Sequence, residues 1–201
     1  MFKLAVTIAA VMAIAGSVAD AQTVNVTAQG NKAVLFNFSG LSNLGLGAYQ
    51  GGVGGKYYIS DGMAVRGMLD FAINNQTTKG AANFTDATDN TLGFGLGAGL
   101  EYHLPLASKV SPYFGGLVSF MTTAETFTPS VFTGTVATST KTSTTTFGLG
   151  ALAGVEYFFN QNISLAAEYQ FGLNYSSRTN PSVDILDLGF QTAGLTFAVY
   201  F

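Results

Sequence analysis

A glycine occupies every second position between Gly93 and Gly99, within the segment GFGLGAGLEYHL that ends at Leu104. Closely spaced glycines can bind the phosphates of a dinucleotide, because they let the backbone approach an anion in a turn between a strand and a helix. Here the glycines alternate with apolar residues at period two, and no helical pattern follows them. Nucleotide binding is therefore not expected.

The same segment carries the only histidine of the chain, His103. A histidine between a serine and a carboxylate is the arrangement of nucleophilic acyl transfer. Ser119, Ser164 and several glutamates offer candidate partners for such a triad. The chain has no cysteine, so no disulfide, zinc-thiolate site or thiol nucleophile is available. We expect no metal and no cofactor.

The composition restricts the elements that position these residues. Charged residues make up 9% of the chain and hydrophobic residues 48%, whereas soluble proteins carry about 25% charged residues. Beyond the N-terminal segment no apolar run is long enough for a membrane helix, and bilayers otherwise accept only closed β-barrels. The net charge of −3 shows no basic footprint for nucleic acid.

The first 21 residues have the layout of a secretory signal peptide. Lys3 precedes an apolar run from Leu4 to Ala15, which is too short to span a bilayer, and Ala19-Asp20-Ala21 resembles a cleavage site. We expect residues 1–21 to be removed and residues 22–201 to form one β-barrel domain in a membrane.

Period-two alternation recurs along the remaining chain and predicts long strands. Segments between turn signals number eight, and the connections alternate between tight turns and longer polar loops, as in membrane barrels. Tyr57, Tyr102 and Tyr157 recur just before tight turns, where an aromatic girdle is expected. The predicted strands are residues 32–40, 50–59, 63–74, 90–104, 109–122, 143–159, 163–176 and 186–201.

The chain ends in AGLTFAVYF, with Phe197, Val199 and the terminal Phe201 on one face. This ending resembles the last strand of small bacterial outer-membrane barrels of the OmpA/OmpX and opacity-protein type. The resemblance implies an all-β, eight-stranded, antiparallel up-and-down transmembrane barrel in the bacterial outer membrane. It further implies outer-membrane lipid and lipopolysaccharide as surroundings, and a barrel assembly machinery that reads the terminal row of Phe197, Val199 and Phe201.

Six charges fall inside the predicted strands on the face that carries the glycines, so they are expected to point into the lumen, because a lipid-facing charge is costly. If Ile59 pairs with Met63 across the turn, Lys56 lies opposite Arg66, and two opposed cations need carboxylates nearby. We therefore expect a network that plugs the barrel, whose interior is just wide enough for side chains. A proton or ion path is the alternative. The six residues are Lys56, Arg66, Asp70, Glu101, Glu156 and Glu168.

These patterns favour a monomeric structural or surface-interaction protein, with an extracellular ligand bound by the loops and no enzymatic activity. A narrow solute channel is the second reading, and a lipid A-modifying enzyme of the PagL deacylase type the third. His103 argues against the enzyme, because it precedes the tight turn at Pro105 and points inward, away from the outer leaflet that holds lipid A. The run from Thr133 to Thr146 is interpreted either as a flexible adhesive loop or as strand ends above the membrane.

Overall fold

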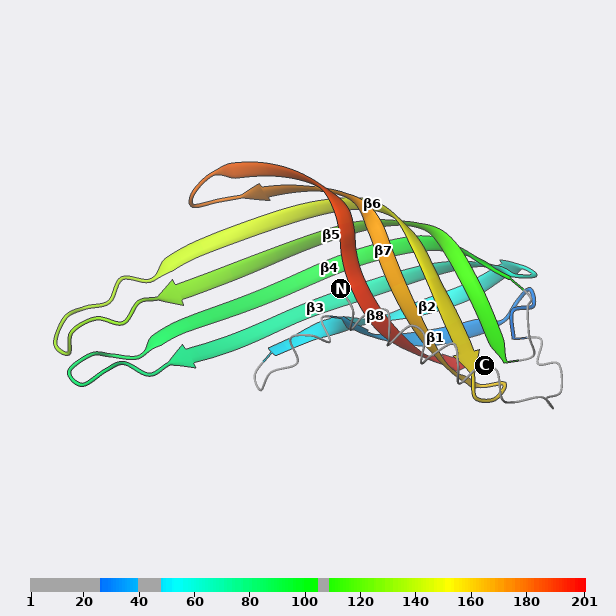
Figure 1. The fold of residues 1–201 in the computed structure, drawn as a ribbon, viewed down its shortest axis with the longest axis horizontal. Coiled ribbons are helices and arrows are strands. Elements are labelled where there is room, and N and C mark those ends of the chain that lie inside the picture. The colour runs from blue at the N-terminus through cyan, green and yellow to red at the C-terminus, as the bar shows by residue number, and fades with distance from the viewer. Residues whose placement is uncertain (1–25, 40–47, 105–108) are drawn as a thin grey trace, which may run out of the picture.

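Eight antiparallel strands close into one barrel, in which each strand pairs with its neighbours in the chain and the last pairs with the first (Figure 1). The computed structural model describes residues 26–39, 48–104 and 109–201. The all-β, eight-stranded up-and-down barrel is thereby confirmed, while the expected signal peptide lies outside the described residues. The strands are β1 (Lys32–Ser39), β2 (Ala48–Ser60), β3 (Met63–Thr78), β4 (Ala87–His103), β5 (Val110–Thr128), β6 (Thr140–Phe158), β7 (Ile163–Arg178) and β8 (Val183–Tyr200). No helix within the described ranges is long and apolar enough to cross a membrane.

The hairpin registers follow from the turns. Gly62 has a φ of +74°, the left-handed conformation that the turn requires, and Lys56 lies opposite Arg66. One detail differs from the sequence prediction: Met63 pairs with Ser60, and the register shifts between Tyr58 and Ser60. A bulge of this kind adds one residue to a strand without moving the pairs on its far side.

Most strands extend further toward the long connections than the alternation predicts. β5 and β6 each have 19 residues, although about ten suffice for a tilted strand to cross a bilayer. Within the Thr133 to Thr146 run, residues 140–146 belong to β6 and residues 133–139 to the connection. β6 extends because its residues pair with β5 up to Phe127 opposite Thr140, and threonine suits a strand.

The two faces of the wall differ in chemistry. Outward apolar side chains are half exposed, for example Leu69, Leu96 and Phe147. The inward face is most buried toward one end of the barrel. This end carries the short β2–β3 turn at Gly62 and the short β6–β7 turn at Asn162, and it is called here the turn end. The opposite end, with the long hairpins, is called the loop end (Figure 1).

Candidate functional site

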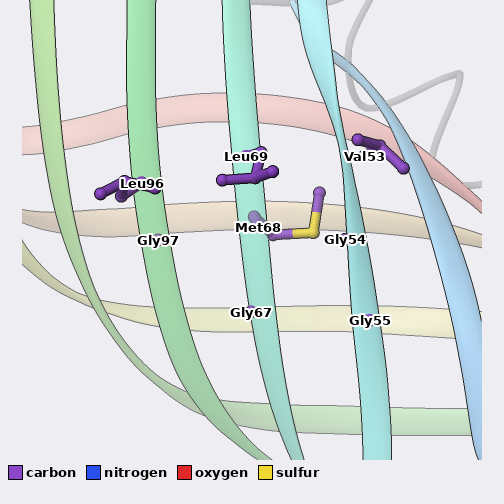
Figure 2. A pocket seen from close by; sticks show the side chains of 8 residues that line it. All are labelled: Val53, Gly54, Gly55, Gly67, Met68, Leu69, Leu96 and Gly97. Atoms are coloured by element: carbon purple, nitrogen blue, oxygen red, sulfur yellow. The ribbon is translucent and has the colours of Figure 1, made fainter.

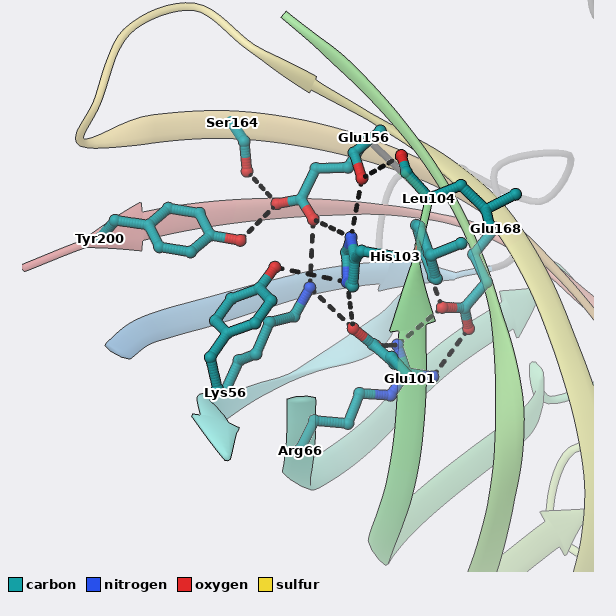
Figure 3. Close-up of polar contacts among 12 residues, drawn as sticks. Lys56, Arg66, Glu101, His103, Leu104, Glu156, Ser164, Glu168 and Tyr200 are labelled. Carbon is teal, nitrogen blue, oxygen red and sulfur yellow. Dashed lines mark hydrogen bonds and ion pairs between the residues drawn. The ribbon is translucent and has the colours of Figure 1, made fainter. Parts of the chain in front are cut away.

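Two cations and three carboxylates meet inside the turn-end half of the barrel (Figure 3). Lys56 points inward from β2, and its Nζ lies 2.8 Å from Glu101 Oε2 and 3.2 Å from Glu156 Oε2. Both glutamates are fully buried. Because an isolated buried charge is strongly destabilising, each of the three groups depends on the others.

Arg66 makes the second set of ion pairs. Its two terminal nitrogens bind the Glu168 carboxylate in a bidentate pair, with Nη1 2.6 Å from Oε2 and Nη2 2.8 Å from Oε1. Nη1 also lies 2.9 Å from Glu101 Oε1. Glu101 therefore sits between Lys56 and Arg66, whose opposed position on neighbouring strands would otherwise bring two like charges together.

Neutral side chains complete the coordination of the carboxylates. The Tyr200 hydroxyl donates to Glu156 Oε1 at 2.7 Å, and Ser164 donates to the same oxygen. Glu168 accepts from the Tyr113 hydroxyl at 3.0 Å and from the Gln170 amide at 2.7 Å. Charge-assisted hydrogen bonds of this kind are stronger than neutral ones, so these residues fix the carboxylates in place.

His103 belongs to the same cluster. Its Nε2 lies 3.1 Å from Glu101 and 3.3 Å from the Tyr58 hydroxyl, and its Nδ1 lies 3.1 Å from Ser111 Oγ. The ring also stacks on Tyr113, with centroids 4.9 Å apart. His103 is thus an inward, buried histidine whose two ring nitrogens both have hydrogen-bond partners.

The row Ser111, His103 and Glu101 has the connectivity of a nucleophilic triad, but it is not arranged to meet a substrate. Ser111 is 6% exposed and His103 2%. A small polar cavity in the lumen is lined by Asp70 and its neighbours, and a depression in the outer wall is lined by Val53 and its neighbours. Ser111, His103 and Glu101 line neither of them. Of the serines suggested by the sequence, Ser164 bonds to Glu156 and Ser119 faces the lumenal cavity.

Asp70 stands apart from the other five predicted charges. No ion pair joins it to another residue in the described part of the chain. It lines a small polar cavity of about 70 Å³ above Arg66, together with Asn37, Ser119 and Gln170. A cavity of this size and lining has room for ordered water.

The predicted tyrosine positions all lie in strands that lead to the turn end. Tyr57 and Tyr102 face outward and are each 42% exposed. Tyr157 is partly buried against Phe159, with ring centroids 5.2 Å apart. The predicted terminal row lies beside β1. The Phe197 and Phe36 ring centroids are 6.4 Å apart, Val199 pairs with Val34, and the Phe201 amide donates to the Lys32 carbonyl at 3.0 Å.

The segment before β1 closes the turn end of the barrel and forms its floor, which the sequence patterns do not predict. Residues 26–31 precede β1 and bind the β2–β3 hairpin, with Gly30 N donating to Tyr58 O and Gly62 N to Thr27 O. Val26 is thereby buried in an apolar cluster that includes Tyr58, Phe158 and Tyr200. Period-two alternation places Tyr58 and Tyr200 on the inward face of their strands. Val26 lies outside the strands, so no periodic pattern predicts that it is buried.

At the loop end, two hairpins are joined at their tips. The β3–β4 and β5–β6 connections exchange backbone hydrogen bonds, from Thr85 N to Val131 O at 2.8 Å and from Thr133 N to Asn83 O at 2.7 Å. Phe84 and Phe132 meet edge to face, with ring centroids 5.8 Å apart. We call residues 79–86 and 129–139 the joined tip.

One ion pair lies on the joined tip. Lys79 Nζ donates to Asp86 Oδ2 at 2.7 Å, and the Gly80 amide donates to Oδ1 at 3.0 Å. The hydrogen bond from Lys79, followed by that from Gly80, holds the pKa of the Asp86 carboxyl below its ordinary value. The same bond to Asp86 raises the pKa of Lys79.

Comparison with known proteins identifies the architecture. The family model for the outer membrane protein beta-barrel domain matches residues 4–201. OprG from Pseudomonas aeruginosa is a similar solved structure, with a TM-score of 0.55 and 15% identity over 89% of this chain and 99% of that one. Ail, the attachment invasion locus protein of Yersinia pestis, has a TM-score of 0.50 and 14% identity over 86% of this chain and 99% of that one. No curated protein matches the sequence.

Proposed function

Because this chain belongs to the outer membrane protein β-barrel family and is located in the bacterial outer membrane, we propose that it is a closed, non-enzymatic barrel that acts at the cell surface. In such barrels short turns face the periplasm and long loops face the outside. The joined tip is then the part that meets other surfaces, and the charged network is the part that closes the lumen.

The joined tip carries the proposal of surface interaction. Phe84 is 49% exposed, Phe132 57% and Val136 88%, although water disfavours such side chains. The backbone bonds between the two hairpins hold these apolar groups in one arrangement. A pre-ordered apolar surface loses little entropy on binding, which favours recognition of a partner.

The interior supports closure. Lys56, Arg66 and their carboxylates cross the lumen from β2 and β3 to β4, β6 and β7. Below them, Val26 and its aromatic neighbours fill the turn end. A solute would have to break ion pairs and then pass a packed apolar layer, so we infer that the network plugs the barrel.

The rest of the wall fits a barrel that is monomeric and surrounded by outer-membrane lipid and lipopolysaccharide. We infer that Tyr57, Tyr102 and Tyr157 mark the periplasmic interface, where a ring prefers the apolar side and a hydroxyl the wet side. The terminal aromatic row that ends in Phe201 would be read by the barrel assembly machinery.

Surface interaction is tested by replacing the tip. Bacteria that display wild-type barrel, or the Phe84→Ser/Phe132→Ser variant, are compared for retention on immobilised sulfated glycan, matrix protein and uncharged hydrophobic surfaces. Phe127→Ser is the control, because Phe127 is a comparably exposed aromatic, at 44%, that lies on β5 opposite Asp89 and outside the joined tip. Loss of retention in the tip variant alone is expected. Equal retention of all three barrels on every surface would refute the proposed role.

A narrow channel is the second candidate, and the polar cavity beside Asp70 is the observation that favours it. Planar-bilayer recording of the refolded barrel separates the two functions. A plugged barrel gives no sustained conductance, whereas steady openings would show that solutes pass the network.

A further inference from the structure

The outer wall is hollowed on β2, β3 and β4. Figure 2 shows Val53, Leu69 and Leu96 standing around glycine positions that carry no side chain. Gly55 and Gly67 pair directly across the strands, and the depression they leave has a volume of about 530 Å³. It is shallow, open to the outside and lined mostly by apolar atoms.

The floor of the depression is closed toward the lumen. The Met68 side chain points to the inner face, and its thioether lies against Gly54 on that side. Whatever fills the depression must therefore approach from outside the barrel, in the plane of the membrane.

The position along β2 assigns the depression to one leaflet. Gly55 and Val53 lie two and four residues from Tyr57, on the same outward face. Two residues of a strand tilted by about 40° climb roughly 5 Å. The depression thus begins about 5 to 10 Å above the periplasmic interface, within the roughly 15 Å thick inner half of the hydrocarbon.

A cation lies at the foot of the depression. Lys32 pairs directly with Tyr57 across β1 and β2, and it is exposed on the outward side of the wall. No ion pair of Lys32 is found in the part of the chain that the structure describes. An ammonium and a phenol hydroxyl at this depth are suited to a phosphate group.

We propose that the depression and the Lys32–Tyr57 pair bind one phospholipid of the periplasmic leaflet. An acyl chain lies in the depression, and the headgroup phosphate accepts from Lys32 Nζ and the Tyr57 hydroxyl. The depression is continuous with the lipid-facing wall, which makes a lipid chain its natural occupant. The leaflet excludes lipopolysaccharide, since that lipid occupies the other side of the membrane.

Two glycine substitutions provide a matched test. A Cβ added at Gly67 has only the Gly97 carbonyl oxygen within reach, at 4.0 Å, so Gly67→Leu fills the depression without disturbing the wall. Gly116 on β5 is also exposed on the outer face, and a Cβ there meets the Gly150 carbonyl oxygen at 3.7 Å. Gly116→Leu is therefore a control that adds the same side chain away from the depression.

The barrels are refolded in vesicles of phosphatidylethanolamine and phosphatidylglycerol, extracted in mild detergent and weighed intact by native mass spectrometry. We expect one phospholipid retained on the wild type and on Gly116→Leu, with retention falling about tenfold in Gly67→Leu, the factor set by losing roughly two methylenes of contact. Lys32→Gln should lower retention while leaving the amount of folded barrel unchanged.

Each other outcome overturns the proposal. Equal lipid retention on the wild type and Gly67→Leu would show that the depression binds no particular chain. A mass of two barrels that Gly67→Leu abolishes would identify a second copy as the occupant. If Lys32→Gln retained lipid as the wild type does, the phosphate contact would be wrong.

Discussion

Replacing Arg66 by methionine should destabilise the barrel through its buried carboxylates. The substitution keeps much of the side-chain volume and removes the charge. Glu168, which is 8% exposed, would keep only the hydroxyl of Tyr113 and the amide of Gln170 as donors. Breaking a buried pair in this way costs about 3 to 5 kcal/mol, because it leaves an uncompensated charge.

A double-mutant cycle then removes the charge of Glu168 as well. In Arg66→Met/Glu168→Gln neither member of the bidentate pair is charged, and the cost should fall well below the sum of the single changes. Urea titration of barrels folded in lipid vesicles, followed by circular dichroism and electrophoretic mobility, gives the free energies of unfolding. We expect a coupling energy of about 2 kcal/mol.

Asp70→Asn serves as the control, since Asp70 has no ion pair among the described residues. It should change the free energy of unfolding by less than about 1 kcal/mol. A coupling energy below about 0.5 kcal/mol between Arg66 and Glu168 would refute the reasoning, because the bidentate pair would then contribute nothing as a pair.

Three further changes test other parts of the structure. Val26→Ala should lower the free energy of unfolding by about 1 to 2 kcal/mol in urea titrations, because Val26 is buried in the floor; an unchanged midpoint would show that the floor is not packed. Gly154→Ala should reduce the folded fraction seen by electrophoresis, since its Cβ would lie 2.6 Å from the Tyr113 hydroxyl, and wild-type yield would contradict that contact. Lys79→Met should raise the pKa of Asp86 in an NMR titration, and an unmoved pKa would disprove the ion pair. The small stabilisation from this exposed pair is present above the unfolded pKa of Asp86 and is lost as the pH falls through its lower folded pKa.

The hairpins could be predicted because their registers depend on nearby residues. Alternation separates the two faces of each strand. The turn at Gly62 then places Lys56 opposite Arg66, and the turn at Asn160–Asn162 places Glu168 opposite Gly154. The one local difference, the bulge before Ser60, left those pairs in place.

Contacts across the lumen depend on how the barrel closes. Arg66 and Glu168 are 102 residues apart, and their meeting depends on the stagger of all eight strands, which no single turn specifies. For the uncharged members of the network, such as Ser164 and Tyr113, the sequence predicts an inward side chain but not the carboxylate to which it donates. Val26 could not be placed at all, because a short segment outside the strands has no period to follow.

The order of the network's members along the chain has a consequence for assembly. Glu156 on β6 is held by Lys56 near the start of the barrel and by Tyr200 at its end. The contact with Lys56 joins β2 to β6 across the lumen and cannot form before the sheet closes, so in an unfinished sheet these charges face water and incur little desolvation penalty. Sealing the lumen and closing the ring are then a single late event, and an intermediate that has not closed is also one that is not sealed.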